Sequence, residues 1–270
     1  MNFNAIVKDQ FNKQAANFDS WCTPKNLDYL KGFLEFVSIS CQDTLLDVAS
    51  GTGDFVVFSS DKVREATGVD ISDKLIELSR NKKDELHLTN INFKIGDVEN
   101  LPFEDNSFTV VTCKSSLHHM PRYEKVFAEM LRCCKRGGRV ALCDIMAFDD
   151  QEIDDIFEAF EKLVDLSHYK TLHKTEFEEL FHKNHIAISR TFQLQIEHTI
   201  PEYLSHAYQS DESLRSVERL LDKAKNLRGI ERFLDNTDRD MSEMKFRRQV
   251  FLISGVKHKY LAQKDNNHDH

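Results

Sequence analysis

The stretch TLLDVASGTGDF, Thr44 to Phe55, decides the fold that we expect of this chain. Thr44 to Ala49 is a short apolar run, which is typical of a strand buried on both faces. Ser50 to Gly53 follows, and its two glycines let the backbone turn sharply and approach a ligand closely. Asp54 then stands where a helix would begin. A strand, a glycine turn and a helix in this order present free backbone N–H groups to one end of a ligand.

The glycine spacing separates two classes of ligand. A dinucleotide site has glycines at the first, third and sixth positions after the strand, and these positions hold Ala49, Gly51 and Asp54 here. The order acid, x, small, x, Gly, x, Gly from Asp47 to Gly53 instead resembles the first motif of class I S-adenosylmethionine-dependent methyltransferases. Ala49 replaces the first glycine of that family. An ordinary strand-to-helix turn of an α/β protein is the structural alternative.

Acidic residues at two later strand ends extend this pattern. The next predicted strand, Ala66 to Asp70, ends at about the distance at which a βαβ unit returns its second strand beside the first. The Asp70 carboxylate can accept hydrogen bonds from both ribose hydroxyls of an adenosine, and Ile71 can pack against the adenine face. Ser72 is the expected N-cap of the helix that follows, through Asn81. Asp97, after the third predicted strand, Ile91 to Ile95, can accept from the adenine amino group, while the N–H of Val98 can serve a ring nitrogen.

Two neighbouring histidines follow the fourth predicted strand, Phe108 to Cys113. They belong to the segment KSSLHHM, which opens with Lys114 and contains His118 and His119. Ligands of doubly wound sheets lie outside the carboxyl ends of the strands at the switch point, so the first and fourth strands flank the site. Only one of two neighbours in a helical turn can point squarely inward, and we expect it to be His119, as a general base. A structural or solvent-exposed histidine is the alternative.

The composition is that of a globular, acidic protein. With 270 residues, 40% of them hydrophobic, the chain can bury the core of one large domain. Lys and Arg total 36 against 45 acids, a formal charge of −9, which disfavours a nucleic-acid substrate. The six cysteines lack paired C-x-x-C spacing, so no metal site and no disulfide framework are expected. No apolar run approaches the roughly eighteen residues of a membrane span, and no export signal is evident, which predicts a cytoplasmic protein.

The alternation of strands and helices predicts an α/β fold: a Rossmann-like, doubly wound, seven-stranded sheet, mostly parallel, with an antiparallel last strand. We expect a single methyltransferase domain with an N-terminal helical cap (1–43) and a cofactor-binding core (44–146). The C-terminal part (147–257) would contain a helical insert at about 200–244, a natural lid where substrate choice is decided. The polar tail, 258–270, is expected to be disordered.

Beyond residue 150 the predicted elements are local patterns. Ile153 to Val164 carries a helical apolar stripe. Thr175 and Glu178 have the spacing of a capping box. Ile186 to Ile196 and Gln249 to Val256 are the remaining strand candidates.

The motifs together resemble a class I methyltransferase of the methyltransferase-11 type over roughly residues 10–146. The run D-V-A-x-G-T-G-D is similar to the ubiquinone/menaquinone biosynthesis C-methyltransferases, and the L-H-H pattern recurs in small-molecule methyltransferases of the family. The quinone enzymes carry an arginine–asparagine pair at the positions of His118 and His119, so the resemblance supports the cofactor more firmly than it supports a quinone acceptor. It implies in-line transfer of a methyl group from S-adenosyl-L-methionine to a small-molecule acceptor, the chemistry of EC class 2.1.1.

The resemblance also implies the candidate site residues. An aromatic of the leading helix, Phe18, would close over the cofactor. The catalytic candidates are His119 and His118, and no metal ligand is expected. The cofactor-binding candidates are Phe18, Asp47, Ala49, Ser50, Gly51, Thr52, Gly53, Asp70, Ile71, Asp97, Val98 and Lys114. A homodimer is left open, and two rival functions remain: a non-catalytic protein that binds S-adenosylmethionine on the same fold, and an NAD-dependent oxidoreductase.

Overall fold

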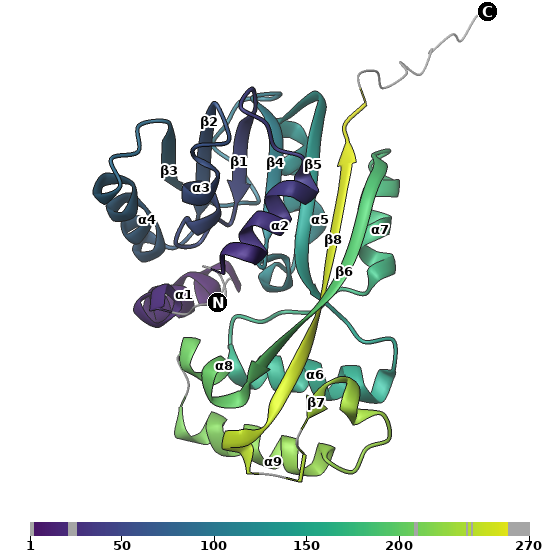
Figure 1. The fold of residues 1–270 in the computed structure, drawn as a ribbon. Coiled ribbons are helices and arrows are strands. Elements are labelled where there is room, and N and C mark those ends of the chain that lie inside the picture. The colour runs from purple at the N-terminus through teal and green to yellow at the C-terminus, as the bar shows by residue number, and fades with distance from the viewer. Residues whose placement is uncertain (1–2, 21–25, 208–209, 236, 239, 259–270) are drawn as a thin grey trace, which may run out of the picture.

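Figure 1 shows the computed structural model of the chain, which describes residues 3–20, 26–207, 210–235, 237–238 and 240–258. Its centre is a sheet with the strand order β3-β2-β1-β4-β5-β8-β6, and β7 pairs with β8 beside this path. The parallel strands are β1 (Thr44–Val48), β2 (Glu65–Asp70), β3 (Ile91–Ile95), β4 (Phe108–Lys114) and β5 (Cys134–Met146). The antiparallel strand β8 (Lys245–Val256) lies between β5 and β6 (Ala187–Thr199).

This topology confirms the predicted doubly wound sheet, mostly parallel with an antiparallel last strand. The predicted count of seven strands is one too low, since the sheet has eight. The additional strand is β7 (Leu234–Asp235). Two residues are too few to show the alternation by which a strand is found in a sequence.

Helices cover both faces of the sheet. On one face α2 (Leu27–Val37), α3 (Asp54–Ser59) and α4 (Asp73–Glu85) bury side chains such as Phe33, Phe55 and Ile76. On the other face α5 (Tyr123–Cys133) and α7 (Lys174–Lys183) bury Phe127 and Phe181. The core is therefore continuous on either side of the parallel strands, and their carboxyl ends stay available for a site.

Side-chain caps fix where two of these helices begin. Asn26 accepts a hydrogen bond from the Tyr29 N–H at the start of α2. Ser72 accepts one from the Leu75 N–H at the start of α4, as the sequence predicts. The predicted capping box of α7 is wrong in register, because the N-cap is His173 and the Glu176 side chain accepts from its N–H.

Strands β6 and β8 extend past the ends of the parallel strands into a second lobe (Figure 1). We call this part the C-terminal lobe; it contains α6 (Gln151–Val164), α8 (Ile200–His206), α9 (Asp211–Ala224), the short helices η3 (Ile230–Arg232) and η4 (Met241–Glu243), and β7. The lobe has its own aromatic core, in which the rings of Phe160 and Phe246 lie 5.0 Å apart. Helices thus occupy much of the region, about 200–244, where the sequence predicts a helical insert. The predicted division of the chain into a cap, a core and a C-terminal part stays a prediction.

Helix α1 (Phe3–Ser20) lies across the sheet's lower end, next to the C-terminal lobe (Figure 1). Lys8 forms an ion pair of 2.9 Å with Asp73 of α4. On the lobe side, the Gln14 amide donates to the Asp165 carboxylate at 3.4 Å. The predicted tail, 258–270, falls almost wholly outside the described residues.

Candidate active site

A cavity lies where four parallel strands end. Ala49, Ile71, Asp97 and Ser115, which follow β1, β2, β3 and β4, line it together. Helix α1 and the C-terminal lobe complete the wall, with Asn4, Val7, Phe11, Glu161, Asp165, His168, Tyr203, His206 and Arg248. The strand ends that the sequence selects therefore converge on one cavity.

The turn after β1 has the left-handed backbone that its motif requires. Gly51 has φ = 55°, and Ala49, in the place of the family's first glycine, has φ = 56°. A residue with a Cβ pays about 1–2 kcal/mol in this conformation, so Ala49 adopts the glycine geometry at a cost. Gly53, with φ = 75°, does not line the cavity; a Cβ there would lie 2.5 Å from Cε1 of Phe93.

Asp70 links the end of β2 to this turn. Its Oδ2 accepts from the Gly51 N–H and its Oδ1 from the Ser72 N–H, each at 2.9 Å. Burial raises the pKa of Asp70, and the backbone N–H groups of Ser72, Gly51 and Ile71 oppose that rise. Each carboxylate oxygen keeps a second lone pair, so the side chain can still accept a hydrogen bond from a ligand hydroxyl.

Asp47 lies in β1, beneath the turn. The Thr112 hydroxyl of the neighbouring strand donates to its Oδ1 at 2.7 Å. Burial raises the pKa of Asp47 to about 6, against the opposing influence of Thr112 and of the Lys114 ammonium. A cationic group entering the cavity would favour the ionised form of this carboxylate.

The rim of the cavity is formed after β3 and by α1. Asp97 is exposed; its Oδ1 accepts from the Glu99 N–H at 2.9 Å, and the Asn4 amide of α1 donates to its Oδ2 at 3.4 Å. Val98 and Ile71 are half-buried and line the cavity. Phe18 lies in α1, but its side chain is outside the part of the chain that the structure describes.

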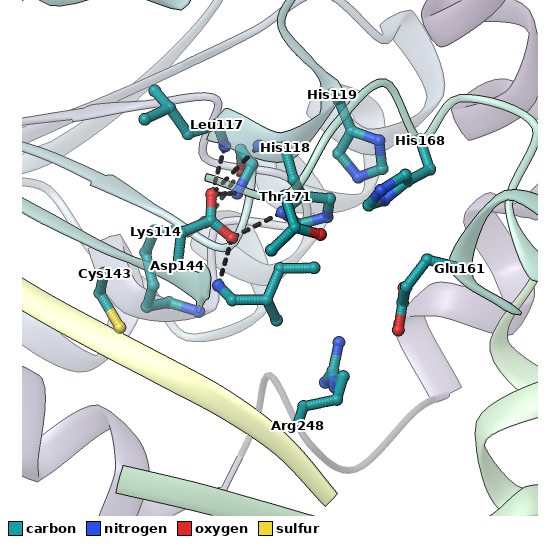
Figure 2. Close-up of polar contacts among 12 residues, drawn as sticks. Lys114, Leu117, His118, His119, Cys143, Asp144, Glu161, His168, Thr171 and Arg248 are labelled. Atoms are coloured by element: carbon teal, nitrogen blue, oxygen red, sulfur yellow. Dashed lines mark hydrogen bonds and ion pairs between the residues drawn. The ribbon is translucent and has the colours of Figure 1, made fainter. Parts of the chain in front are cut away.

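His118 belongs to a buried His–Asp pair (Figure 2). The short helix η2 (Leu117–His119) follows β4, and the His118 Nδ1 lies 2.6 Å from Oδ1 of Asp144. Backbone N–H groups of Ser116, Leu117 and His118 donate to the Asp144 Oδ2, and that of Ile145 donates to its Oδ1. The Asp144 carboxylate raises the pKa of His118 although burial opposes this rise, and His118 in turn lowers the pKa of Asp144.

His119 has neutral partners in place of a carboxylate. Its Nδ1 lies 3.0 Å from the Ser167 carbonyl oxygen, and Phe11 packs edge-on against the ring with 5.0 Å between centroids. Burial, together with the charge of His118, lowers the pKa of His119. Both histidine rings line the cavity, whereas the sequence argument expects only one to point inward.

The C-terminal lobe contributes a wall of buried polar side chains. The Tyr203 hydroxyl donates to Oε2 of Glu161 at 2.7 Å and accepts from Nη1 of Arg248 at 3.2 Å. Nη2 of Arg248 lies 3.1 Å from Nε2 of His198. Burial and the Arg248 charge lower the pKa of His198 to about 3, which keeps this ring neutral as an acceptor.

Sequence reasoning identified one side of the cavity only. Among the predicted site residues whose side chains the structure describes, every one lines the cavity apart from Gly53; the roles of these residues stay predictions. The sequence argument missed Asp144, Glu161, His168 and Arg248. Of these four residues, only Asp144 could have been found from the sequence, because it is an acid near the carboxyl end of β5, the strand next to β4.

Two further properties concern the described residues as a set. They contain no group of three or more His, Cys, Asp or Glu side chains that could hold a metal ion. Within the same ranges, none of the helices combines the length and the apolar character that a membrane crossing needs.

Comparison with known families defines the class of protein. Residues 39–237 match a family described as a methyltransferase domain, and the chain belongs to this family. The matched domain is therefore of the methyltransferase class, EC 2.1.1, and the family implies S-adenosylmethionine as the methyl donor. This membership decides against the oxidoreductase alternative.

Individual relatives agree with this class. The chain is similar to the uncharacterized methyltransferase YcgJ of Bacillus subtilis strain 168, with 32% identity over 143 residues, 53% of this chain and 56% of that protein. It is also similar to the demethylmenaquinone methyltransferase of Oceanobacillus iheyensis, with 32% identity over 119 residues, 43% of this chain and 50% of that protein. The chain thus spans about half the length of the curated relatives it matches.

Solved structures show the same fold. The crystal structure of YcgJ from Bacillus subtilis superposes with a TM-score of 0.77 at 24% identity, over 86% of this chain and 99% of that chain. A geranyl diphosphate methyltransferase in complex with SAM gives a TM-score of 0.57 at 18% identity, over 85% of this chain and 84% of that chain. At these identities the likeness concerns the fold alone.

Proposed function

We propose that this chain transfers the methyl group of S-adenosyl-L-methionine to a small-molecule acceptor that binds between the turn after β1 and the C-terminal lobe. One observation carries the proposal: the motif residues of the turn, Asp70, and the histidines of η2 line the same cavity. Donor and acceptor would thus meet in one space, and aligning two reactants can contribute as much as about 7–11 kcal/mol.

The residues present fit this donor. Ser50 Oγ is buried in the turn without a hydrogen-bond partner, and the oxygens of Asp70 keep lone pairs for the ribose hydroxyls. Asp97 and Val98 stand at the rim for the adenine ring. When bound, S-adenosyl-L-methionine supplies a methyl group that is activated for displacement by its sulfonium.

We assign the general base to His118. Since the Asp144 carboxylate only accepts hydrogen bonds, Nδ1 of His118 carries the proton and Nε2 is the atom that can take one from the acceptor. Its raised pKa makes His118 a stronger base than His119, whose pKa is lowered, although sequence placement alone favours His119. Asp144 acts as a positioning residue. A general base contributes roughly 10²–10⁴-fold when the acceptor must lose a proton.

The test is a ligand comparison on the full chain. S-adenosylhomocysteine at a hundred times its dissociation constant should stabilise the fold by about 2.7 kcal/mol. For a chain of this size that shift corresponds to roughly 5–10 °C in melting temperature. NAD⁺ at the same concentration should leave the melting temperature unchanged. A protein that responds to neither S-adenosylhomocysteine nor S-adenosylmethionine would refute the proposal.

A further inference from the structure

The wall that the C-terminal lobe adds to the cavity contains buried polar atoms of Glu161 and His168 that have no hydrogen-bond partner. Figure 2 shows Glu161, His168 and Arg248 apart from the contacts around Asp144. Glu161 is 2% exposed and His168 is 5% exposed, and both line the cavity. Their Oε1 and Nδ1 atoms, respectively, form no hydrogen bond. Buried polar atoms are rarely left unpaired in proteins, so each one calls for a partner.

Both atoms are hydrogen-bond acceptors. Oε2 of Glu161 already accepts from the Tyr203 hydroxyl, which leaves Oε1 to a different donor. Nε2 of His168 lies 3.3 Å from Oε1 of Glu158, and a carboxylate only accepts, so Nε2 carries the proton. In the neutral ring, Nδ1 then carries a free lone pair and accepts hydrogen bonds. The cavity wall therefore presents two acceptors and needs a ligand that brings donors.

The local charge is compatible with more than one kind of donor. Arg248 lies on the same wall and is held by the Tyr203 hydroxyl and by His198. The positive charge of Arg248 offsets the negative charge of the Glu161 carboxylate. The wall therefore accommodates a neutral hydroxyl as well as an ammonium. A group that can only accept, such as an ether or a carboxylate, would leave both wall atoms unsatisfied.

We propose that Glu161 and His168 form a subsite that binds an N–H or O–H group of the methyl acceptor. This inference rests on the proposed function and adds to it the chemical class of the acceptor. The donor-bearing end lies against α6 and the loop that follows it, while the atom to be methylated faces His118. The subsite thus selects methyl acceptors that carry an N–H or O–H group at this end over acceptors that are only apolar there.

The experiment uses three probes of similar shape on the full chain saturated with S-adenosylhomocysteine. Benzylamine offers an ammonium, benzyl alcohol a hydroxyl and benzyl methyl ether no donor, and saturation-transfer NMR reports the binding of each. We expect at least one of the two donors to bind and the ether to bind about tenfold more weakly or not at all. Stronger binding of the amine or of the alcohol identifies which donor the subsite prefers.

Variants separate the subsite from the rest of the site. Glu161→Gln and, independently, His168→Gln should each weaken the bound donor probe by about tenfold, while the affinity for S-adenosylhomocysteine stays that of the wild type. Glu152→Gln, an exposed position of the same helix, is the matched control and should change neither. Binding of no probe, equal binding of the ether, or variants that bind the donor probe unchanged would overturn the assignment. A wild-type chain that does not bind S-adenosylhomocysteine would instead overturn the proposed function.

Discussion

Replacing Asp70 by Asn tests the cofactor site with a minimal change. Asp70 is 7% exposed, and each of its oxygens accepts one backbone N–H, from Gly51 and from Ser72. An asparagine has nearly the same shape but one acceptor oxygen only. Its NH₂ group would face one of the two N–H groups, so one buried donor would lose its partner.

The magnitude follows from these contacts. A hydrogen bond to a charged group contributes about 1.5–3 kcal/mol. Burial disfavours the Asp70 anion and raises its pKa. Removing the charge therefore removes a cost of burial, which offsets part of the stability lost with the hydrogen bond. We expect the free energy of unfolding to fall by about 1–2 kcal/mol. The affinity for S-adenosylhomocysteine should fall by about 10- to 100-fold, because a ribose hydroxyl loses a charged acceptor.

Calorimetric titration with S-adenosylhomocysteine measures the binding effect, and urea unfolding measures the stability effect. Asp73→Asn is the matched control: it removes an acid three residues further on whose side chain is 52% exposed and paired with Lys8. Surface ion pairs contribute about 0–1 kcal/mol, so this variant should bind the ligand like the wild type. A dissociation constant for Asp70→Asn within about twofold of the wild type, against the 10-fold or more expected, would refute the ribose contact.

Two further predictions concern the turn and the histidine pair. Gly53→Ala should destabilise the fold by about 1–3 kcal/mol more than Gly229→Ala, the matched control. Both glycines have a positive φ, but only at Gly53 would a Cβ meet the Phe93 ring. Equal decreases in the free energy of unfolding, measured in urea, would exclude the Phe93 contact as the cause. The ring of His118 should titrate by NMR with a midpoint above 6.5, and its resonance should vanish in His118→Gln. Because the folded state raises this pKa, His118 stabilises the fold below pH 6.5 and loses that contribution as the pH rises through the raised value; a midpoint below 6.5 would contradict the Asp144 pairing.

The parallel half of the fold could be predicted closely from the sequence. The third strand, Ile91–Ile95, has the predicted bounds, and Ser72 caps the helix that it was expected to cap. Both features are local, since a short apolar run and a capping serine need no distant partner. The capping box of α7 failed for the same reason: His173 is an unusual N-cap, and the more familiar pattern two residues later was misleading.

The two sides of the cavity differ in predictability because they are built over different distances in the chain. The turn after β1 and the strand ends acquire their roles from neighbours in sequence, which a motif can record. Glu161 lies within an apolar helical stripe and is nevertheless buried, because the Tyr203 hydroxyl, 42 residues away, donates to it. Arg248, a further 45 residues along, completes that network. A buried carboxylate is tolerated only with such partners, and no local pattern reports them, so the acceptor side of the site becomes visible only when α6, α8 and β8 are brought together.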